Sequence, residues 1–400
     1  MNKFMKHLFR PCPICESFFG EILYRQVFSL PSSSPLPNEY DIVSCINCRF
    51  VFADTPSNQQ TYNDYYTLLS KYEDIEISSG GGTNNYDYDR LERTAKTIQT
   101  ILNNKSLSIL DMGCANGGLL KSLKKLGFNN IMGIDPSKTC NTYVNNEGIS
   151  CMEGDIFSES FKNLSITFDC FILTHVLEHI YDLKIAIGNI VSKIKENGIL
   201  YVEVPDASRY FEYYMVPYYY IDCEHINHFD KNSLSNLICS KGFRLVETKN
   251  IDFKLNETRN YPAVYSIFQK TSQLSDKTFE ISEDSQISFL KFVEQSKMKN
   301  ENDIIINQLV ENQQPIIIWG AGQFTLRLLA NSSLDKCNII GFIDSDSNKQ
   351  GKKLLDHTIY SSDFLYNKEV SVVICSAIHH LDILKKINEM KIQSIVYIMK

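Results

Sequence analysis

The sequence predicts an α/β protein with two nucleotide-type sheets, each flanked by helices, preceded by a small module rich in cysteine. Residues 109–118 and 315–325 each run from an apolar strand through a glycine-rich turn into a helix. That order of elements forms the ligand-binding corner of doubly wound α/β sheets. Four cysteines near the N-terminus form two closely spaced pairs, as in metal-binding modules. We expect a metal-binding domain at 1–60, a first sheet with a substrate segment at 61–270, a helical linker at 271–300 and a second Rossmann-like sheet at 301–400.

Length, composition and charge limit the possible classes of protein. With 400 residues and 43% hydrophobic content, the chain can bury the cores of two or three domains. Its net charge of −7 and the absence of long Lys/Arg runs argue against a nucleic-acid partner. No stretch approaches the length of a membrane span, and residues 1–10 lack the apolar core of a secretion signal. We therefore expect a cytoplasmic protein with no membrane partner, either a monomer or a small homo-oligomer.

Two Cys-x-x-Cys pairs predict a metal site. Cys12 and Cys15, and likewise Cys45 and Cys48, place two thiolates on one tight turn, so four sulfurs can surround one tetrahedral ion. The strand-and-loop pattern between the pairs is typical of a zinc ribbon. Four thiolates fill the coordination sphere of Zn²⁺, which predicts a structural role for the metal. A pair of redox dithiols and a set of unligated surface cysteines are the alternatives.

The first glycine turn indicates which ligand its sheet binds. A dinucleotide fold has Gly-x-Gly-x-x-Gly, which lets a pyrophosphate sit on the helix N-terminus. Here Asp111 takes the first of those positions, and its charge would repel pyrophosphate but suits a cationic ligand with an ammonium group. Asp135 ends the next apolar strand, where a carboxylate can accept hydrogen bonds from both ribose hydroxyls. S-adenosylmethionine (AdoMet) fits both features.

Later segments continue the same pattern. Residues 153–156 follow the third strand, at the position where AdoMet enzymes hold the adenine amino group. Residues 168–173 form a buried fourth strand, and residues 197–204 form a helix stop and a fifth strand. This ordered series resembles the class I AdoMet-dependent methyltransferases. We therefore expect their sheet in the middle of the chain, between the zinc ribbon and the second Rossmann-like domain. The residues expected at AdoMet are Asp111, Gly113, Cys114, Gly117, Asp135, Pro136, Asp155, Ile156 and Thr174.

The second glycine turn is degenerate. Thr325 stands in place of its third glycine, which makes close packing of the helix against a dinucleotide less easy. Three interpretations remain open for this turn: a phosphate cradle for a nucleotide-linked substrate, an NAD site and a purely structural repeat. The residues predicted to bind substrate are Gly320, Gly322, Gln323 and Asp344, together with Tyr72 from a tyrosine-rich stretch before the first sheet.

The order of zinc ribbon, AdoMet sheet and degenerate nucleotide fold resembles the C-methyltransferases of deoxysugar biosynthesis over essentially the whole chain. These enzymes methylate a keto sugar attached to a nucleoside diphosphate. The resemblance implies that the middle domain holds AdoMet and that the nucleotide of the sugar lies between the middle and last domains. It also implies that a Glu-His dipeptide after the fifth strand is catalytic, and Glu224 and His225 match that dipeptide.

Transfer of a methyl group to carbon requires a base, because a proton next to a carbonyl must leave before the enolate can attack the methyl. We assign that role to His225, since an imidazole can take up a proton near neutral pH. Glu224 would orient the imidazole or a sugar hydroxyl, and His179 and Tyr220 are candidate donors to the carbonyl oxygen. The competing interpretation is that Glu224 and His225 only cap the helix that starts near Asp230.

Two further histidines receive other roles. His175 and His179 share one helical face, but the glutamate that follows the first histidine in zinc proteases is missing, so we expect no metal there. We expect His175 to be structural and His228 to close a loop or cap a helix.

The chain departs from the family pattern beside the expected sugar pocket. Residues 256–263 replace a glycine-rich segment, and Asp222 stands where a tyrosine is common. These differences do not affect the expected use of AdoMet. They leave the substrate and the methylated atom undecided. An O-methyltransferase of a nucleotide sugar or surface polysaccharide would use the same His225 to deprotonate a hydroxyl. A non-catalytic scaffold that binds AdoMet and nucleotide, and an NAD-dependent oxidoreductase, are the remaining alternatives.

Overall fold

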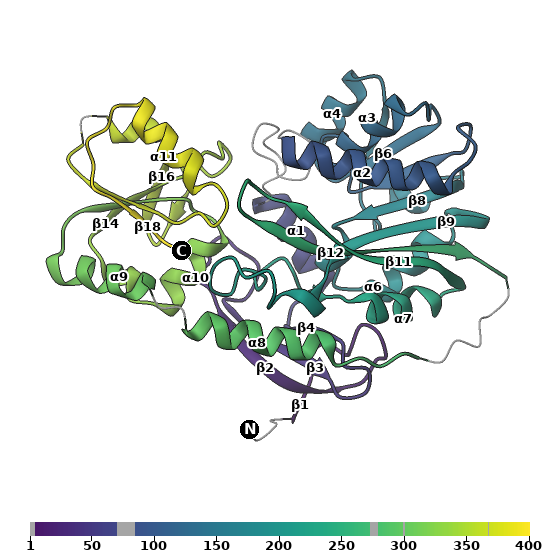
Figure 1. Cartoon of the computed structure of the whole chain (residues 1–400), viewed down its shortest axis with the longest axis horizontal. Helices are drawn as coiled ribbons and strands as arrows, with labels where there is room; N and C mark the ends of the chain where they lie inside the picture. Colours follow the sequence, from purple (N-terminus) through teal and green to yellow (C-terminus); the bar gives the residue numbers. More distant parts are fainter. Residues whose placement is uncertain (1–4, 70–84, 273–278, 299–300, 367) are drawn as a thin grey trace.

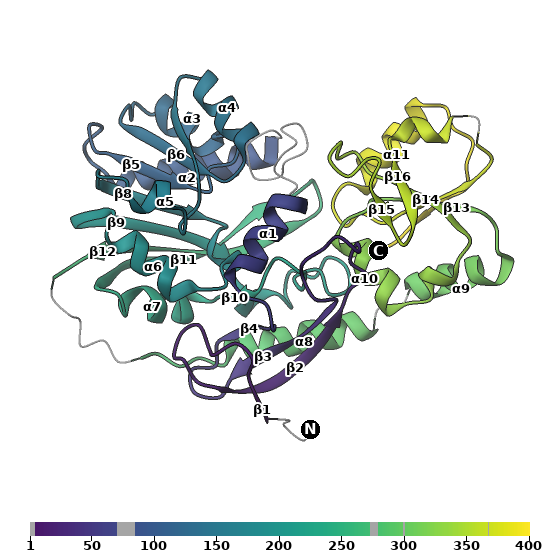
Figure 2. The same ribbon diagram turned by 180° about the vertical axis from the view of Figure 1, so that it is seen from behind.

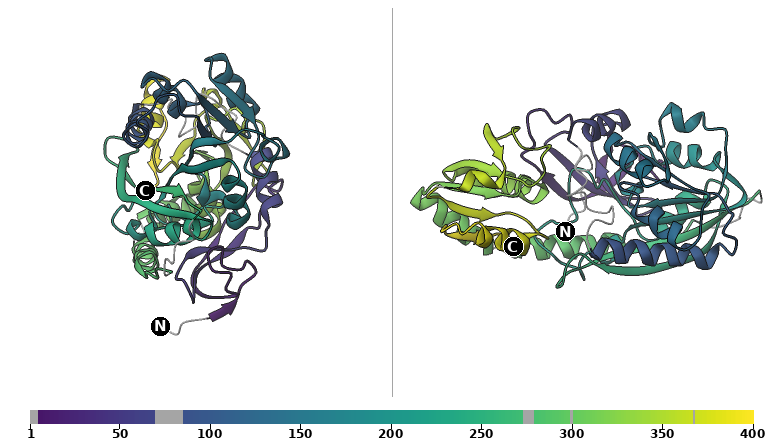
Figure 3. Two further views of the ribbon diagram at one scale, coloured as in Figure 1. Left: turned by 90° about the vertical axis from the view of Figure 1, so that its right-hand side faces the viewer. Right: turned by 90° about the horizontal axis from the view of Figure 1, so that it is seen from above.

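The computed structural model describes residues 5–69, 85–272, 279–298, 301–366 and 368–400. Three β-sheets organise these residues (Figure 1), and the predicted α/β class with a Rossmann-like sheet in the middle of the chain is confirmed. The middle and C-terminal sheets lie towards opposite ends of the long axis, and the N-terminal sheet contacts both units (Figure 3). None of the described helices is both long enough and apolar enough to cross a membrane.

The middle sheet has the strand order β11-β12-β9-β8-β5-β6-β7. Its strands are β5 (Ile109–Met112), β6 (Ile131–Asp135), β7 (Ser150–Glu153), β8 (Phe168–Thr174), β9 (Ile194–Pro205), β11 (Phe243–Lys254) and β12 (Asn260–Lys270). Strands β5 to β9 are parallel, and β12 and β11 complete the sheet in antiparallel pairing. Chain order reverses between β5 and β8, and open α/β sheets bind ligands at the carboxyl ends of the strands beside such a point.

Helices pack on this sheet because their apolar sides must be buried. They are α2 (Asn85–Ile101), α3 (Gly118–Lys125), α4 (Lys138–Asn146), α5 (Glu159–Lys162), α6 (Leu183–Val191) and α7 (Lys231–Cys239), with the 3₁₀ turns η2 (Leu177–His179) and η3 (Ala207–Arg209). The side chain of Asp230 accepts the backbone N–H of Ser233 at 2.7 Å and so caps α7. The interpretation of Glu224 and His225 as the caps of this helix is therefore wrong.

The N-terminal sheet is antiparallel, in the order β1-β2-β3-β4-β10. Its strands are β1 (Met5–His7), β2 (Phe19–Val27), β3 (Glu39–Cys45), β4 (Val51–Asp54) and β10 (Asn227–His228). The strand β10 comes from the middle of the chain, and it places Asn227 opposite Phe52 and His228 opposite Val51. His228, expected to close a loop or cap a helix, is instead a fully buried strand residue. A segment of residues 61–270 thus completes the sheet of the N-terminal module.

The C-terminal sheet has the order β15-β16-β14-β13-β17-β18. Its strands are β13 (Ile316–Trp319), β14 (Ile339–Ile343), β15 (Lys353–Leu354), β16 (His357–Tyr360), β17 (Ser371–Ile374) and β18 (Val396–Ile398). All pairs are parallel except β15 with β16. The helices and 3₁₀ turns of this region are α9 (Glu301–Asn312), α10 (Gln323–Asn331), α11 (His380–Glu389), η4 (Leu334–Lys336) and η5 (Ser362–Leu365). The predicted second Rossmann-like fold is therefore present as a mixed sheet.

Two helices lie between the units. Helix α1 (Gln59–Leu69) lies near the centre of the molecule beside the middle sheet (Figure 2). Residues 271–300, predicted to be a helical linker, contain α8 (Asp284–Met298). Phe289 and Phe292 of α8 are buried in one apolar cluster with Tyr220 of the middle segment and Phe324 of α10. Helix α8 is therefore part of the core that joins the three units and is not a solvated connection.

Candidate active site and metal site

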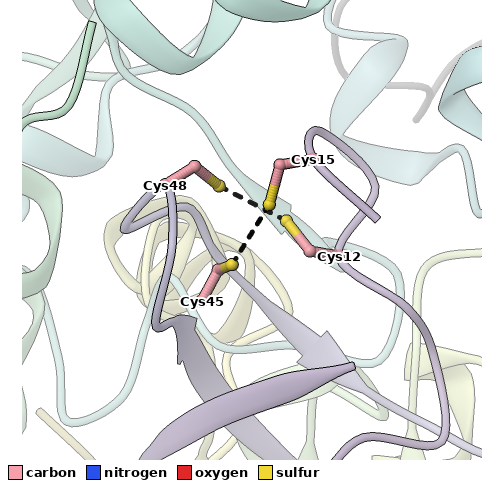
Figure 4. Close-up of side chains that lie close together, drawn as sticks. All are labelled: Cys12, Cys15, Cys45 and Cys48. Carbon is pink, nitrogen blue, oxygen red and sulfur yellow. Dashed lines mark hydrogen bonds between the residues drawn. The ribbon is translucent and has the colours of Figure 1, made fainter. Parts of the chain in front are cut away.

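Four cysteine sulfurs converge in the N-terminal module (Figure 4). Cys12 Sγ lies 3.4 Å from Cys48 Sγ, Cys15 Sγ lies 3.4 Å from Cys45 Sγ, and all four sulfurs lie within 4.8 Å of one another. Sulfurs bound to one tetrahedral Zn²⁺ stand about 3.8 Å apart, since each Zn–S bond is about 2.3 Å long. None of the four forms a disulfide. The cluster is therefore consistent with the predicted zinc ion.

The two turns that carry the cysteines share one backbone geometry. The N–H of Glu16 donates to Cys12 O at 2.8 Å, and the N–H of Arg49 donates to Cys45 O at 3.0 Å. Glu16 and Arg49 both adopt left-handed backbone angles, with φ of 64° and 62°. The N–H of Asn47 also lies 3.4 Å from Cys45 Sγ, where it favours the thiolate that binds metal. The repeated turn brings each pair of sulfurs to the same side.

Glycines form the turn where β5 ends. Gly113 and Gly117 have φ of 75° and 69°, a backbone region that L side chains rarely adopt. A Cβ at Gly113 would lie 2.9 Å from a methyl group of Val176, and a Cβ at Gly117 would lie 2.9 Å from a methyl group of Val144. Both positions therefore require glycine for the turn itself, and α3 begins directly after Gly117.

Asp111 is a buried acidic residue, and the positive charge of Arg90 only partly offsets the effect of burial on it. Its side chain is almost fully buried, and Oδ1 has no hydrogen-bond partner among the described residues. Burial, together with the negative charge of Asp135, raises the pKa of Asp111 to about 8. A positively charged ligand would satisfy this oxygen and lower the pKa again. An ammonium-bearing ligand such as AdoMet fits this requirement, whereas a pyrophosphate does not.

Asp135 holds the glycine turn from the next strand. Its Oδ2 accepts the N–H of Ala115 at 2.8 Å, and its Oδ1 accepts the N–H of Ser137 at 2.9 Å. Each carboxylate oxygen can accept more than one hydrogen bond. These contacts orient the side chain at the carboxyl end of β6, the edge of the sheet where the ribose of AdoMet is expected.

Cys114 differs from its neighbours in the turn. Its Sγ lies 3.5 Å from Cys151 Sγ and packs 2.6 Å from the point where a Cβ on Gly133 would be. The side chain thus points back into the sheet, and the predicted contact of Cys114 with AdoMet can come only from its backbone.

The other predicted AdoMet residues lie at the ends of neighbouring strands. Asp155 follows β7 and accepts the backbone N–H two residues later at 2.7 Å, and the adjacent Ile156 is buried. Thr174 is the last residue of β8, and Pro136 is exposed directly after β6. These positions follow the carboxyl edge of the sheet.

His175 belongs to a buried network of charges. Its Nδ1 lies 3.1 Å from Glu178 Oε1 and its Nε2 lies 3.5 Å from Glu203 Oε1, and Arg90 Nη1 lies 3.6 Å from the same Glu203 oxygen. Burial alone would lower the pKa of His175, but the hydrogen bonds to the two glutamates outweigh it and raise the pKa above 6.5. Burial likewise opposes ionisation of Glu203, yet His175 and Arg90 bring its pKa to about 2. The contacts with the two glutamates thus hold the His175 side chain in place, as expected of a structural residue.

The predicted catalytic histidines lie together. The rings of His179 and His225 are in edge-to-face contact, with centroids 4.7 Å apart. A ring nitrogen of each and a carboxylate oxygen of Glu178 lie within 4.8 Å of one another. Glu178 is buried, its Oε2 has no hydrogen-bond partner among the described residues, and the neighbouring histidines outweigh burial and hold its pKa below 4.5. A buried carboxylate ion thus faces the two imidazoles.

His179 is a neutral imidazole at pH 7. Burial, with the nearby His225, lowers the pKa of His179 to about 4. Its Nδ1 lies 2.8 Å from the Tyr66 hydroxyl and 3.2 Å from the carbonyl oxygen of Glu224. The Glu224 carbonyl can only accept, so a hydrogen bond to it places the proton of the neutral imidazole on Nδ1. When the Tyr66 hydroxyl donates to Nδ1 instead, the proton is on Nε2 and can be donated to a ligand oxygen.

Asp222 fixes the loop that carries the predicted Glu-His pair. Its Oδ1 accepts the N–H of Glu224 at 2.8 Å and the N–H of His225 at 2.7 Å. The hydroxyl of Tyr65 donates to Glu224 Oε1 at 3.3 Å, and the hydroxyl of Tyr40 donates to the carbonyl oxygen of Asp222. The aspartate that departs from the family pattern therefore builds the turn in this chain. Residues 221–226 are called the catalytic loop below.

Tyr220 does not occupy the position predicted for it. Its side chain is buried, stacks on Tyr210 with ring centroids 4.0 Å apart, and donates its hydroxyl proton to the carbonyl oxygen of Tyr213. Because this proton is already used within an aromatic cluster, the predicted role of Tyr220 as a donor to substrate is wrong.

Three residues to which the sequence assigned no catalytic or binding role lie at the site. Tyr65 and Tyr66 of α1 contact Glu224 and His179, and Glu178 supplies the buried charge. The tyrosine-rich stretch before the first sheet was the available signal, but tyrosines in such a stretch look alike in sequence. Tyr72, predicted to bind substrate, lies outside the described residues.

The second glycine turn is held by a carboxylate like the first, but its N-cap glycine is extended where that of the first is left-handed. Gly320 has φ of 111°, and a Cβ there would lie 2.7 Å from the carbonyl oxygen of Cys375. Gly322 is the N-cap of α10, and a Cβ there would meet nothing within 4 Å. Asp344 follows β14 and its Oδ2 accepts the N–H of Ala321 at 2.8 Å. The turn is therefore closely packed at Gly320 and uncrowded at Gly322.

Gln323 differs from the other residues of this turn. Its side-chain amide contacts Cys223 and Glu224 of the catalytic loop. Only the backbone of Gln323 can then contribute to the substrate contact predicted for it.

Two family models match the chain. Residues 86–248 match a family described as a methyltransferase domain, and residues 312–396 match a family described as C2185-like, N-terminal. The first match runs from α2 into β11 and leaves out β12, and the second covers most of the C-terminal sheet.

Curated proteins and solved structures are also similar to parts of the chain. The ubiquinone biosynthesis O-methyltransferase of Rickettsia prowazekii (strain Madrid E) is 30% identical over 125 residues, which are 30% of this chain and 49% of that protein. The protein of the same name from Rhizobium etli is 24% identical over 102 residues, 24% of this chain and 41% of that protein. The chain thus spans less than half the length of these relatives.

Among solved structures, the [4+2]-cyclase SpnF has 14% identity and a TM-score of 0.40, covering 54% of this chain and 97% of its own. Magnesium protoporphyrin IX methyltransferase from Synechocystis PCC 6803 with bound SAM has 16% identity and a TM-score of 0.37, covering 54% and 98%.

The family match and the geometry of the middle sheet lead to one conclusion. The sheet order, the glycine turn with its buried Asp111 and the carboxylate of Asp135 are the features expected of an AdoMet site. The prediction of an AdoMet-dependent methyltransferase fold is confirmed, and residues 86–248 of this chain are a class I AdoMet-dependent methyltransferase domain.

Proposed function

We propose that the chain transfers the methyl group of AdoMet to a carbon atom of a keto sugar that is linked to a nucleotide. The observation that carries this proposal is the contact of His225 with His179, beside the buried carboxylate of Glu178, next to the carboxyl end of β8. A base, a neutral hydrogen-bond donor and a fixed negative charge then stand together at the edge of the AdoMet sheet.

Each of these groups has a task in forming a carbon nucleophile. His225 removes the proton next to the substrate carbonyl, and Nε2–H of His179 donates to the oxygen on which negative charge develops. The carboxylate of Glu178 stabilises the imidazolium that His225 becomes. AdoMet, when bound, supplies a methyl group on a sulfonium that leaves readily. Glu224, held by Tyr65, is positioned to bind a sugar hydroxyl or orient His225.

The same three groups are also a ligand set for a divalent transition metal, which two histidines and one carboxylate can bind. The two roles exclude each other, because a metal would take the lone pair that a general base needs. We favour the acid–base role because it gives the neutral His179 and the charged Glu178 separate tasks in the reaction.

The nucleotide of the acceptor would lie at the C-terminal glycine turn. Backbone N–H groups at the start of a helix attract phosphate, and α10 begins at this turn with an uncrowded Gly322. The start of α10 also contacts the catalytic loop. A nucleotide-linked sugar bound across this contact would bring its sugar towards His225.

A second candidate is transfer to oxygen. The curated relatives are named O-methyltransferases, and His225 could deprotonate a sugar hydroxyl by the same geometry. The two candidates differ only in the atom that attacks the methyl group.

The deciding experiment incubates the protein with AdoMet carrying a ¹³C-methyl group and with thymidine and uridine diphosphate keto sugars, followed by NMR of the product. We expect a methyl signal bonded to carbon. A methoxy signal would replace the carbon acceptor by an oxygen acceptor. The same sugars without nucleotide are the control, and equal rates with and without nucleotide would remove the nucleotide-linked substrate.

A further inference from the structure

The start of α10 contacts the catalytic loop, although the helix belongs to the C-terminal unit and the loop to the middle unit. Gln323 Oε1 accepts the N–H of Cys223 at 3.4 Å, and Gln323 Nε2 donates to Glu224 Oε1 at 3.5 Å. One helical turn later, Arg327 Nη1 donates to the carbonyl oxygen of Ile221 at 3.0 Å. Residues four apart share one face of a helix. One face of α10 therefore forms hydrogen bonds with the loop segment just before His225.

Gln323 also stands where the C-terminal fold would receive a phosphate. It is the first residue of α10 and directly follows the N-cap, Gly322. Its backbone N–H is one of the groups that a helix start offers to an anion. Its side chain contacts the catalytic loop. A bound phosphate would therefore contact the backbone of the same residue whose side chain contacts the loop.

The contact continues from Glu224 into the methyl-transfer site. The carbonyl oxygen of Glu224 lies 3.2 Å from His179 Nδ1, and Asp222 Oδ1 binds the N–H groups of both Glu224 and His225. The N–H of Ile226 donates to the carbonyl oxygen of Glu178 at 2.9 Å. A displacement of the loop at Glu224 would therefore act on the positions of His179 and His225.

We propose that Gln323 is a positioning residue that couples nucleotide binding in the C-terminal fold to the alignment of Glu224 and His225. This inference rests on the proposed function, because it takes a nucleoside diphosphate as the occupant of the C-terminal turn. A nucleotide at the start of α10 fixes Gln323, and Gln323 fixes the catalytic loop. Binding energy from the remote part of the substrate is then used to align the reacting groups. The coupling is reciprocal, as any coupling between two binding equilibria must be.

The first test needs no turnover. The full chain is labelled with ¹⁵N-histidine, saturated with S-adenosylhomocysteine, and titrated with thymidine diphosphate and uridine diphosphate as probes. We expect the ring signals of His225 and His179, assigned from single-histidine variants, to shift when a nucleotide binds to the wild type. In Gln323→Ala the nucleotide should still bind, within about threefold of the wild-type affinity because the backbone N–H remains, but the histidine shifts should disappear.

The matched control is Asn331→Ala. Asn331 is the last residue of the same helix and donates to the carbonyl oxygen of Val27, away from the catalytic loop. If loosening α10 were enough, Asn331→Ala would also abolish the histidine shifts. We expect it to leave them intact, and their loss in this control would overturn the specific role of Gln323.

The second test separates positioning from binding. With a nucleotide-linked acceptor, Gln323→Ala should lower kcat by about tenfold and leave KM for the acceptor within about twofold, because alignment is lost and binding is not. Equal kcat in variant and wild type would overturn the inference while methyl transfer, and with it the proposed function, stands. If the wild type binds neither nucleotide, the nucleotide-linked acceptor is wrong as well.

Discussion

Asp135 and Asp344 make the same hydrogen bond to a glycine turn in two different sheets. Asp135 Oδ2 accepts the N–H of Ala115 at 2.8 Å, and Asp344 Oδ2 accepts the N–H of Ala321 at 2.8 Å. In both cases the carboxylate stands at the carboxyl end of the second strand, Asp135 as the last residue of β6 and Asp344 directly after β14, and holds the glycine turn that follows the first strand. The two differ in surroundings: Asp135 lies near the buried Asp111, whereas Lys349 Nζ lies 3.1 Å from Asp344.

This pair provides a test of the AdoMet site. Asp135→Ala should weaken AdoMet binding by at least about tenfold, because hydrogen bonds to a charged acceptor contribute about 1.5–3 kcal/mol. The rate at saturating AdoMet should change less. Asp344→Ala is the matched control and should leave AdoMet affinity unchanged by calorimetry. Equal losses in both variants would mean that the effect comes from a weakened fold.

His225→Ala tests the general base. We expect turnover to fall by about two orders of magnitude or more, with AdoMet affinity little changed, because the side chain acts on the acceptor. His7→Ala, at an exposed histidine of β1, is the control. Wild-type rates in His225→Ala would show that the base lies elsewhere, and a wild type without any turnover would favour the scaffold interpretation.

Asp111 should release a proton when AdoMet binds. The pKa of Asp111 is raised to about 8 by burial and by Asp135, so the carboxyl is mostly protonated at pH 7 in the free protein. A cationic ligand favours the ionised form, so affinity should rise as pH increases from 6 to 8 and level off above that. Calorimetry in two buffers of different ionisation enthalpy should detect about one released proton per AdoMet. Asp111→Asn should abolish the release, and Asp155→Asn should retain it.

Loss of a cysteine from the four-cysteine cluster should also disturb residues 221–226. In Cys45→Ser we expect less than one zinc per chain, faster hydrogen exchange in β4 and β10, and reduced turnover, because β10 begins two residues after His225. AdoMet affinity should fall less, since Asp111 and Asp135 lie in another sheet. Cys239→Ser, at a cysteine outside the cluster, should behave like wild type. A folded N-terminal sheet after chelation, with substoichiometric zinc, would contradict the metal assignment.

The buried histidine network predicts a pH-dependent stability. The pKa of His175 is raised above 6.5, so its contribution is fully present below pH 6.5 and is lost as pH rises through the folded-state pKa. Each unit of such a shift contributes about 1.4 kcal/mol. Thermal unfolding should therefore show wild type losing stability relative to His175→Gln as the pH rises above 6.5. A constant difference between the two proteins would mean that His175 is not charged in the fold.

Local sequence patterns were sufficient for much of the fold. Apolar runs that end in glycine or a carboxylate identified β5, β6, β13 and β14, because the burial of a short apolar run and the backbone freedom of glycine act over a few residues. The Cys-x-x-Cys turns were predictable for the same reason, since both sulfurs of a pair come from one turn. Tyr220 was misassigned because nothing local distinguishes a tyrosine that stacks in a core from one that faces a ligand.

By itself, the sequence determined the two nucleotide-type sheets, the four-cysteine module and the Glu-His pair as a candidate for catalysis. Only the tertiary structure decided that β10 completes the N-terminal sheet, that Glu178 and Tyr66 surround His179, and that Gln323 reaches Glu224. Turns and strands follow from interactions between near neighbours in the chain. Contacts between residues about a hundred positions apart depend on how whole units pack, and no local pattern records that packing.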